Sequence, residues 1–249
     1  MKLLDTVIVF DQGNLLKSKG WESTYAALSS AVSAMEHPLG AGSFQIRAKE
    51  KKVSSKGKET TQWLRNGVKP IKDQFQNRMR GLPQWKTEHP LSLDKEIKQV
   101  TESVWMTYPK LVALPEKLHS SVGDLDFWGI VEGQRVAIEW ETGNISSSHR
   151  SVNKLCLALL SEVLDICVLI VPSRNLYEHL TDRVGNWKEL SPYLPFWRKI
   201  GESGVKKGLL AFAIVEHAEL ITGNKTFPFI SVGIDGRSAQ GKRSRKIRG

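Results

Sequence analysis

The chain has 249 residues, of which 40% are hydrophobic and 25% are charged, so it can bury a full core and has an ordinary globular composition. The 36 lysines and arginines outnumber the 26 acids and give a formal net charge of +10. This balance favours a polyanionic partner, with nucleic acid first and an anionic membrane surface second. We expect one domain over residues 1–249, with a basic flexible arm at about 233–249 that has too little apolar surface to fold alone.

Membrane insertion and secretion are not expected. No apolar run approaches the roughly 18–20 residues of a membrane span. The N-terminal MKLLDTVIVFDQG is not a signal peptide, because Asp5 interrupts it and its apolar run is too short. Cys156 and Cys167 both lie inside apolar runs, which predicts buried, reduced thiols. We therefore expect a cytoplasmic protein.

The N-terminal half mixes one strand with several helices. Residues 1–13 predict a short strand and turn, and residues 21–35 have helical spacing that ends at Pro38 and Gly40. Residues 47–58 (RAKEKKVSSKGK) predict a solvated loop, for which phosphate contact and simple hydration are equally good interpretations. Further helices are predicted at 62–79 and 97–108, the second ended by Pro109.

The C-terminal half predicts an α/β sheet covered by helices on both faces. DLDFWGIVEGQRVAIEWE reads as a hairpin, with strands at 126–131 and 135–141 around the turn at 132–134. A helix follows, because apolar residues recur at 3.6-residue spacing from Val152 to Leu160. Strands are then predicted at 166–171 and 209–215, with short helices at 176–180 and 187–194.

Two acids stand out in this hairpin, Glu139 and Glu141. On a strand, residues two apart point to the same face, so these carboxylates share one side while Val136, Ile138 and Trp140 fill the other. The hairpin also brings Asp126 beside them. Three converging carboxylates repel one another, and a divalent cation such as Mg²⁺ relieves this repulsion.

Mg²⁺ at a phosphodiester polarises the phosphoryl oxygen and positions water, so the cluster suggests a nuclease. The bare spacing is a weak pattern, and solvated strand acids are the alternative. Asp124 is a rival for the aspartate position because it shares a strand face with Asp126. We prefer Asp126, which lies deeper in the strand and precedes Phe127 and Trp128.

The stretch EWETGNISSSHRSVNKLCL resembles the active-site strand and following helix of the BamHI-type type II restriction endonucleases, in the PD-(D/E)XK nuclease superfamily. Four further segments resemble that family in order: RNGVKPIK (65–72), WKTEHPLSL (85–93), LTDRVGNWKELSPY (180–193) and GIDGRSAQGKRS (233–244). The resemblance runs from about residue 65 to the end, with large gaps. It implies a restriction-endonuclease-like core, in which helices flank both faces of a central mixed β-sheet.

The resemblance also implies roles for the acids. Asp126 and Glu139 would bind the metal. Glu141 stands where most superfamily members carry a lysine, and it would be a general base. Glu88 matches another active-site acid that is linked to the metal. The chain departs from the family in a shorter loop between Asp126 and Glu139 and in a long insertion after Glu88, so Glu88 is the least certain of the four.

DNA contacts follow from the same resemblance. Asn144, Ser146 and Arg150 begin the helix after the acids and match major-groove contacts, as do Asp182 and Arg183. Without the resemblance, Asp182 and Arg183 would read as a surface ion pair. Arginine suits guanine, asparagine suits adenine and aspartate can accept from cytosine. The remaining expected contacts are the minor-groove residues Gly233 and Asp235, and Lys69 and Lys72, which either hold phosphates or are simply exposed.

Because all five major-groove residues are present, we expect the palindrome GGATCC, cut with Mg²⁺ to leave 5′ overhangs. A related site such as RGATCY, or a DNA-binding protein that does not cleave, are the alternatives. A palindrome implies a homodimer. The family dimerises through helices that correspond to about 150–162 and 186–199, where Leu155, Leu159, Trp187 and Leu190 fit either a dimer contact or the core. His149 is expected to be structural.

Overall fold

The computed structural model describes residues 1–91, 123–181 and 184–232. The helix expected at 97–108, the residues Asp182 and Arg183, and the C-terminal arm with Gly233 and Asp235 lie outside the described residues. Within the described ranges, no helix is long and apolar enough to cross a membrane.

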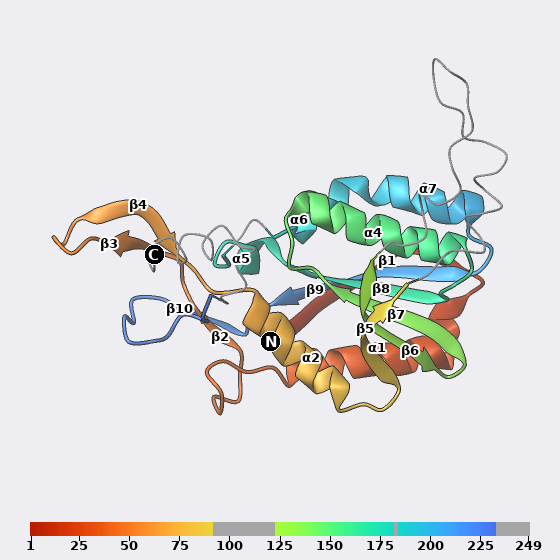
Figure 1. The fold of residues 1–249 in the computed structure, drawn as a ribbon, viewed down its shortest axis with the longest axis horizontal. Coiled ribbons are helices and arrows are strands. Elements are labelled where there is room, and N and C mark those ends of the chain that lie inside the picture. Colours follow the sequence, from red (N-terminus) through yellow and green to blue (C-terminus); the bar gives the residue numbers. More distant parts are fainter. Residues whose placement is uncertain (92–122, 182–183, 233–249) are drawn as a thin grey trace, which may run out of the picture.

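A six-stranded mixed sheet forms the centre of the molecule (Figure 1). Its strands lie in the order β1-β9-β8-β7-β6-β5. Strands β7, β8 and β9 run parallel, while β1, β6 and β5 pair antiparallel with their neighbours. The strands are β1 (Lys2–Gln12), β5 (Trp85–Pro90), β6 (Asp124–Val131), β7 (Gln134–Trp140), β8 (Ile166–Pro172) and β9 (Gly208–Glu216).

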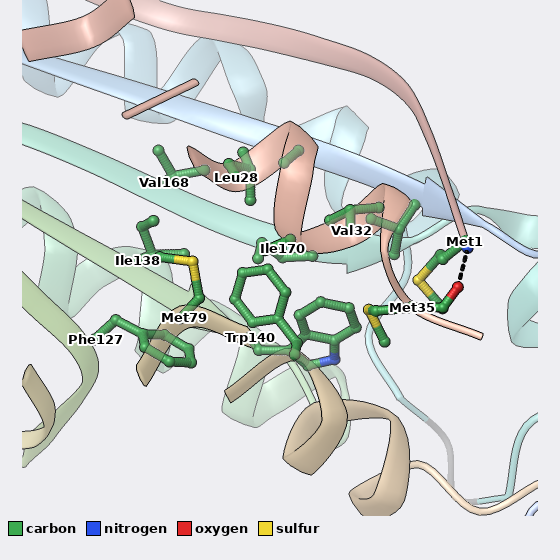
Figure 2. Close-up of a cluster of buried hydrophobic side chains, with 14 of the residues drawn as sticks. Met1, Leu28, Val32, Met35, Met79, Phe127, Ile138, Trp140, Val168 and Ile170 are labelled. Atoms are coloured by element: carbon green, nitrogen blue, oxygen red, sulfur yellow. Dashed lines mark hydrogen bonds between the residues drawn. The ribbon is translucent and has the colours of Figure 1, made fainter. Parts of the chain in front are cut away.

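Helices cover both faces of this sheet, as predicted. On one face lie α1 (Lys19–Ser33) and α2 (Lys69–Arg80), and on the other lie α4 (Ile145–Leu160), α6 (Trp187–Leu190) and α7 (Leu194–Gly204) (Figure 1). Alternate residues of each central strand point to opposite faces of the sheet and pack in the hydrophobic cluster on each face. Val168 of β8 packs in the cluster with Leu28 of α1, and Leu169 packs in the cluster with Leu155 of α4. Figure 2 shows part of the first cluster.

The two longest described helices, α1 and α4, begin where a polar side chain caps their first turn. Ser18 accepts a hydrogen bond from the Trp21 amide at 3.2 Å, and Asn144 accepts one from the Ser147 amide at 3.1 Å. Shorter elements complete the described chain: η1 (Leu15–Lys17), α5 (Arg174–Tyr177), η3 (Ser191–Tyr193), and the pairs β2 (Gln45–Arg47) with β10 (Glu219–Ile221) and β3 (Glu50–Val53) with β4 (Glu59–Leu64).

Two predictions for the N-terminal half were wrong. The basic segment 47–58 is not a loop, because it contributes to a two-stranded antiparallel ribbon made by β3 and β4. The helix expected from residue 62 begins only at Lys69, with Pro70 in its first turn. The preceding Asn66 and Gly67 are buried and bonded to distant segments, so they cannot continue a helix.

Candidate active site

The three predicted carboxylates line one cavity of about 980 Å³. Asp126 comes from β6, Glu139 from β7, and Glu141 directly follows β7. The hairpin register places Asp126 beside β7, where its Oδ2 accepts a hydrogen bond from the Trp140 amide at 2.8 Å. Ile138 and Trp140 face the opposite hydrophobic layer, so the predicted division of the strand into two faces is confirmed.

Two lysines from flanking helices compensate these acids. Lys72 of α2 contacts Asp126 with an Nζ–Oδ1 distance of 2.5 Å, and Lys154 of α4 contacts Glu139 with an Nζ–Oε1 distance of 2.6 Å. The Lys154 and Glu139 side chains are only 11% and 8% exposed. The Lys154–Glu139 pair therefore lies largely out of contact with solvent, where opposite charges interact strongly.

Packing of the helices fixes where these lysines lie. Phe75 of α2 meets Phe127 of β6 and Trp140 of β7, with ring centroids 5.2 and 4.8 Å apart. Lys72 stands one helical turn before Phe75, on the side of α2 that faces the sheet. Sequence analysis missed Lys154 altogether, although it lies four residues after Arg150 and so on the same side of α4.

Burial makes both glutamates poor acids. It raises the pKa of Glu139 to about 7, and repulsion from Asp126 adds to this, while Lys154 opposes it. Burial likewise raises the pKa of Glu141 to about 7, although its Oε1 accepts a hydrogen bond from the Gly143 amide at 2.5 Å. The other oxygen, Oε2, has no hydrogen-bond partner among the described residues. Groups with such pKa values can exchange protons near neutral pH.

The carboxylates are not gathered into a ready metal site. Within residues 1–91, 123–181 and 184–232, no three His, Cys, Asp or Glu side chains are grouped closely enough to hold a metal ion. The chemistry of the cavity nevertheless suits a hard cation. It offers carboxylate oxygens, one of them without a hydrogen-bond partner, and it already requires two lysines for charge balance.

Glu88 and Asp124 lie at the margin of this cavity. Glu88 belongs to β5, the strand next to β6, but its side chain is exposed and does not line the cavity. Its backbone has a φ of 53°, a left-handed conformation that costs energy for a residue with a Cβ. The side chain of Asp124 is exposed, and its carbonyl oxygen accepts a hydrogen bond from Lys154 at 2.6 Å.

The predicted reading helix is α4, whose N-cap residue, Asn144, lies three residues after Glu141. Its N-cap Asn144 is exposed, as are Ser146 and Arg150, and Arg150 also lines the cavity. Acids and reading residues are thus joined by Thr142 and Gly143 alone. Lys69, by contrast, is exposed and pairs with Asp73 at 2.8 Å.

The segment around Asp182 and Arg183 is tied to this helix start by its described flanks. The Gly185 amide donates to the Gly143 carbonyl at 3.0 Å, and Val184 forms a β-bridge with Asn144. A Cβ on Gly185 would lie 1.8 Å from Ser148 Oγ, so only glycine allows this approach. The described residues that follow the second predicted major-groove segment therefore lie beside the start of α4, where the first segment begins.

Other predicted residues have structural positions. His149 packs against Tyr193 and Trp197, with centroids 4.4 and 5.6 Å apart, and it does not line the cavity. The two cysteines are buried and free, as predicted. Three of the apolar residues considered for a dimer contact belong to the core, because Leu155, Leu159 and Leu190 are fully buried. Trp187 is partly buried and packs against the same core.

Comparisons with known proteins agree on one family. The family model described as "Restriction endonuclease BamHI" matches residues 1–237. The type II restriction enzyme OkrAI of Oceanobacter kriegii is 38% identical over 175 residues, which are 70% of this chain and 74% of that enzyme. The type II restriction enzyme BamHI of Bacillus amyloliquefaciens is 30% identical over 232 residues, which are 93% of this chain and 89% of that enzyme.

A solved structure supports the fold. The crystal structure of restriction endonuclease BglII complexed with a DNA 16-mer aligns with a TM-score of 0.53 at 10% identity, covering 93% of this chain and 87% of that one. The mixed sheet, the acids at the end of β7 and the sequence relatives lead to one assignment. The chain belongs to the BamHI family and is a type II restriction endonuclease, a site-specific deoxyribonuclease.

Proposed function

We propose that the enzyme hydrolyses one phosphodiester bond in each strand of double-stranded DNA at the palindrome GGATCC, with Mg²⁺ as cofactor, and leaves 5′ overhangs. The observation that carries this proposal is a single cavity lined by Asp126, Glu139 and Glu141 and, on its rim, by Arg150 of the proposed reading helix. Cutting groups and reading groups then act on neighbouring parts of one duplex.

Glu141 is the proposed general base. Its pKa of about 7 lets the carboxylate accept a proton from the attacking water near neutral pH, and its buried Oε2 makes no hydrogen bond to a described residue. The Gly143 amide holds the other oxygen and so fixes the orientation of the carboxylate. Asp126 and Glu139 would hold Mg²⁺, with Glu88 as a further acid nearby, and the ion would polarise the phosphoryl oxygen.

In this scheme Lys72 and Lys154 can each bind either a carboxylate of the cavity or a phosphate of the DNA. In the structure they neutralise Asp126 and Glu139. A DNA phosphate is a competing anion for both, and Lys69 offers another positive charge on α2. Phosphate contacts of this kind position the duplex without selecting its sequence.

Sequence readout is assigned to Asn144, Ser146 and Arg150 on α4 and to Asp182 and Arg183 in the adjoining segment, with Gly233 and Asp235 in the minor groove. The proposed enzyme is a homodimer, because a palindrome presents two equivalent half-sites. The core residues Leu155, Leu159 and Leu190 cannot provide the contact. Exposed apolar residues of the same region can: Leu160, Tyr193 and Phe196 are 38%, 48% and 60% exposed.

One digest tests the proposal. A plasmid of known sequence is incubated with the enzyme, with and without Mg²⁺, and the ends of the fragments are sequenced. We expect cuts only at GGATCC and only with the metal. Any cut at a site without the outer G·C pairs would favour a relaxed site such as RGATCY instead.

The reading assignment has its own test. Arg183→Ala should cost about 1–3 kcal/mol of base discrimination, measured as binding to duplexes with single changes in the site. An equal loss on random DNA would make Arg183 a phosphate contact.

A further inference from the structure

We propose that the ribbon formed by β3 and β4, residues 49–64, is a DNA-binding arm that contacts the sugar-phosphate backbone outside the recognition site. The proposal rests on the proposed function, because it needs DNA bound at the reading segments. The ribbon projects from the body of the protein (Figure 1).

The ribbon has unbalanced positive charge. Residues 49–64 contain five lysines and two glutamates. Both glutamates are already paired, Glu50 with Arg47 at 2.7 Å and Glu59 with Lys51 at 3.0 Å. Lys52, Lys56 and Lys58 are exposed and make no ion pair with any described residue. Lys52 lies on β3, Lys56 in the turn and Lys58 directly before β4, so the outer part of the ribbon is the most basic.

The ribbon also presents apolar surface without a core to bury it. Val53, Trp63 and Leu64 are 55%, 40% and 37% exposed, and Lys49 lies over the Trp63 ring at 5.7 Å. An isolated two-stranded ribbon is only marginally stable in water. Exposed lysines interleaved with apolar groups are typical of a surface that meets phosphates and sugars.

The base of the ribbon is held rigidly against the segment that leads to Asp182. Asn66, fully buried just after β4, donates from its amide to the His179 carbonyl at 2.8 Å and from Nδ2 to the Arg47 carbonyl at 2.8 Å. The Thr181 amide donates to the Asn66 carbonyl at 2.7 Å. At the other strand, the Lys49 amide donates to His179 Nδ1 at 3.1 Å.

Both ends of the ribbon are therefore fixed to residues 179–181, immediately before the proposed reading pair. Lys49 adds an ion pair with Glu178 at 3.3 Å. A duplex read by Asp182 and Arg183 must pass close to this base. The ribbon would then reach the backbone beyond the six base pairs, because it extends outward from the reading segment and not into the cavity.

Charge selects DNA over a second copy of the chain as the partner. Two ribbons brought together would place their unpaired lysines in repulsion, whereas each lysine on a phosphate releases a condensed counterion. Contacts of this kind raise affinity for any sequence and leave the choice of site to the base-reading residues.

The test compares the triple variant Lys52→Gln, Lys56→Gln, Lys58→Gln with a matched triple variant, Lys17→Gln, Lys19→Gln, Lys206→Gln. The control lysines are exposed and do not line the cavity, and Lys206 forms a solvent-exposed ion pair with Glu162 at 2.7 Å. Binding is measured without Mg²⁺ over a range of salt concentrations. Two duplexes carry the same site, one with flanks of about two base pairs and one with flanks of about ten.

We expect the wild type to show a steeper salt dependence on the long duplex than on the short one. The ribbon variant should lose this difference, with a slope smaller by about 0.9 for each phosphate contact removed. The ratio of specific to nonspecific affinity should stay the same, and the control variant should behave as the wild type.

Equal slopes for the ribbon variant and the wild type on the long duplex would overturn the proposal. Equal slopes with a changed sedimentation coefficient would assign the ribbon to protein association instead. If the wild type does not prefer its site over random DNA, the proposed function fails and the ribbon proposal fails with it. If the preference is present but flank length has no effect, only the ribbon proposal fails.

Discussion

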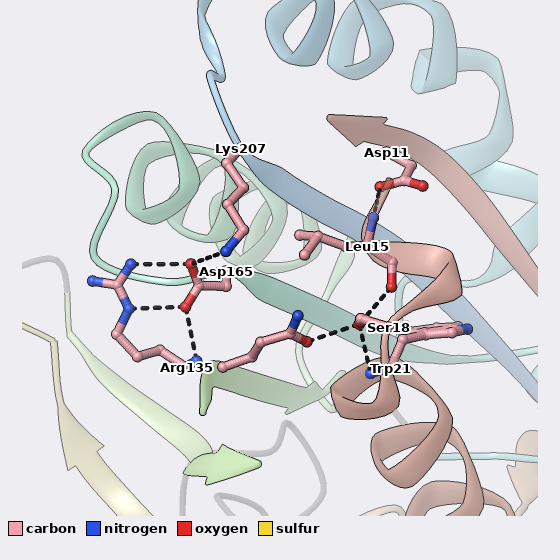
Figure 3. Close-up of polar contacts among 8 residues, drawn as sticks. Asp11, Leu15, Ser18, Trp21, Arg135, Asp165 and Lys207 are labelled. Carbon is pink, nitrogen blue, oxygen red and sulfur yellow. Dashed lines mark hydrogen bonds and ion pairs between the residues drawn. The ribbon is translucent and has the colours of Figure 1, made fainter. Parts of the chain in front are cut away.

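Buried acids lie beside both ends of strand β7, and their pKa values shift in opposite directions. At its start, Asp165 accepts three hydrogen bonds from Arg135, from the amide at 2.9 Å, Nε at 2.9 Å and Nη2 at 3.1 Å (Figure 3). Burial tends to raise the pKa of Asp165, but the hydrogen bonds and charge of Arg135 outweigh it and lower the pKa. At the other end, burial raises the pKa of Glu139 and Glu141 to about 7.

Solvent exposure of the side chains is similar, at 11% for Asp165 and 8% for Glu139, but the glutamates lie deeper in the protein and the partners of the acids differ. Both carboxylate oxygens of Asp165 accept hydrogen bonds from the planar guanidinium of Arg135, whereas Oε2 of Glu141 has no hydrogen-bond partner among the described residues. A satisfied carboxylate stabilises the fold. An unsatisfied one has capacity left for a proton or a cation, which is what a hydrolytic site needs.

The largest effect is expected from a substitution of Glu141, the proposed general base. Glu141→Gln should lower the cleavage rate about 10²–10⁴-fold, because glutamine cannot accept the proton of the attacking water. Binding to the site without Mg²⁺ should be unchanged. The measurement is single-turnover cleavage of a site-containing duplex, and a rate within tenfold of the wild type would remove Glu141 from the mechanism.

The next largest effect is expected on stability, from a substitution of Asp165 at the other end of β7. Asp165→Asn should lower the free energy of unfolding by about 1.5–3 kcal/mol, since charge-assisted hydrogen bonds to Arg135 are lost. Urea denaturation measures this. Lys206→Gln is the control, because its ion pair with Glu162 is exposed to solvent and should contribute little to stability. A loss of cleavage by the folded Asp165→Asn protein, beyond its lost stability, would contradict a purely structural role.

A smaller effect is expected on the pH dependence of stability, measured without metal. The folded-state pKa of Glu141 lies above its unfolded value, so the native protein binds more protons between about pH 4.5 and 7. Stability should therefore fall as the pH rises through this range, and Glu141→Gln should remove on the order of 1–2 kcal/mol of that fall. Identical pH profiles of unfolding for the two proteins would contradict the raised pKa.

The contribution of Asp165 to stability should depend on pH in the opposite direction. Its pKa is lowered by folding, so its contribution is present above the unfolded value and is lost as the pH falls below about 4. Asp165→Asn should therefore flatten the acid limb of the profile, while Glu141→Gln flattens the neutral limb. A variant that affected both limbs would show that the two ends of β7 are coupled.

The sheet could be predicted where burial imposes a pattern. The unbroken apolar runs of β8 and β9, the hairpin of β6 and β7, and the stripe on α4 all belong to the core, so their sequences report their surroundings. The ribbon of β3 and β4 has no buried face, and its residues show no alternation that could have marked it as strands. Strand β5, in which Glu88 lies, has short alternation and a left-handed residue.

The acids of the site could be predicted because they share one hairpin, whose register follows from the sequence alone. The lysines that face them could not. Lys72 and Lys154 come from two helices on opposite faces of the sheet, and each meets its acid only after the helices pack. The same holds for Asn66, whose partners lie at residues 47, 179, 181 and 230. No local pattern encodes contacts of this range.

The pairing of β1 with β9 has a consequence for the kinetics of folding. Residue 2 lies opposite residue 216, so β1, the first strand to be synthesised, can pair only after β9, the last strand of the sheet, has been made. Closing so long a loop is entropically costly and makes folding slow. Until β9 is made, β8 has an open edge and the sheet is incomplete. A nascent chain therefore passes most of its synthesis as an unfinished sheet, and DNA cleavage is expected to begin only after nearly the whole chain has been made.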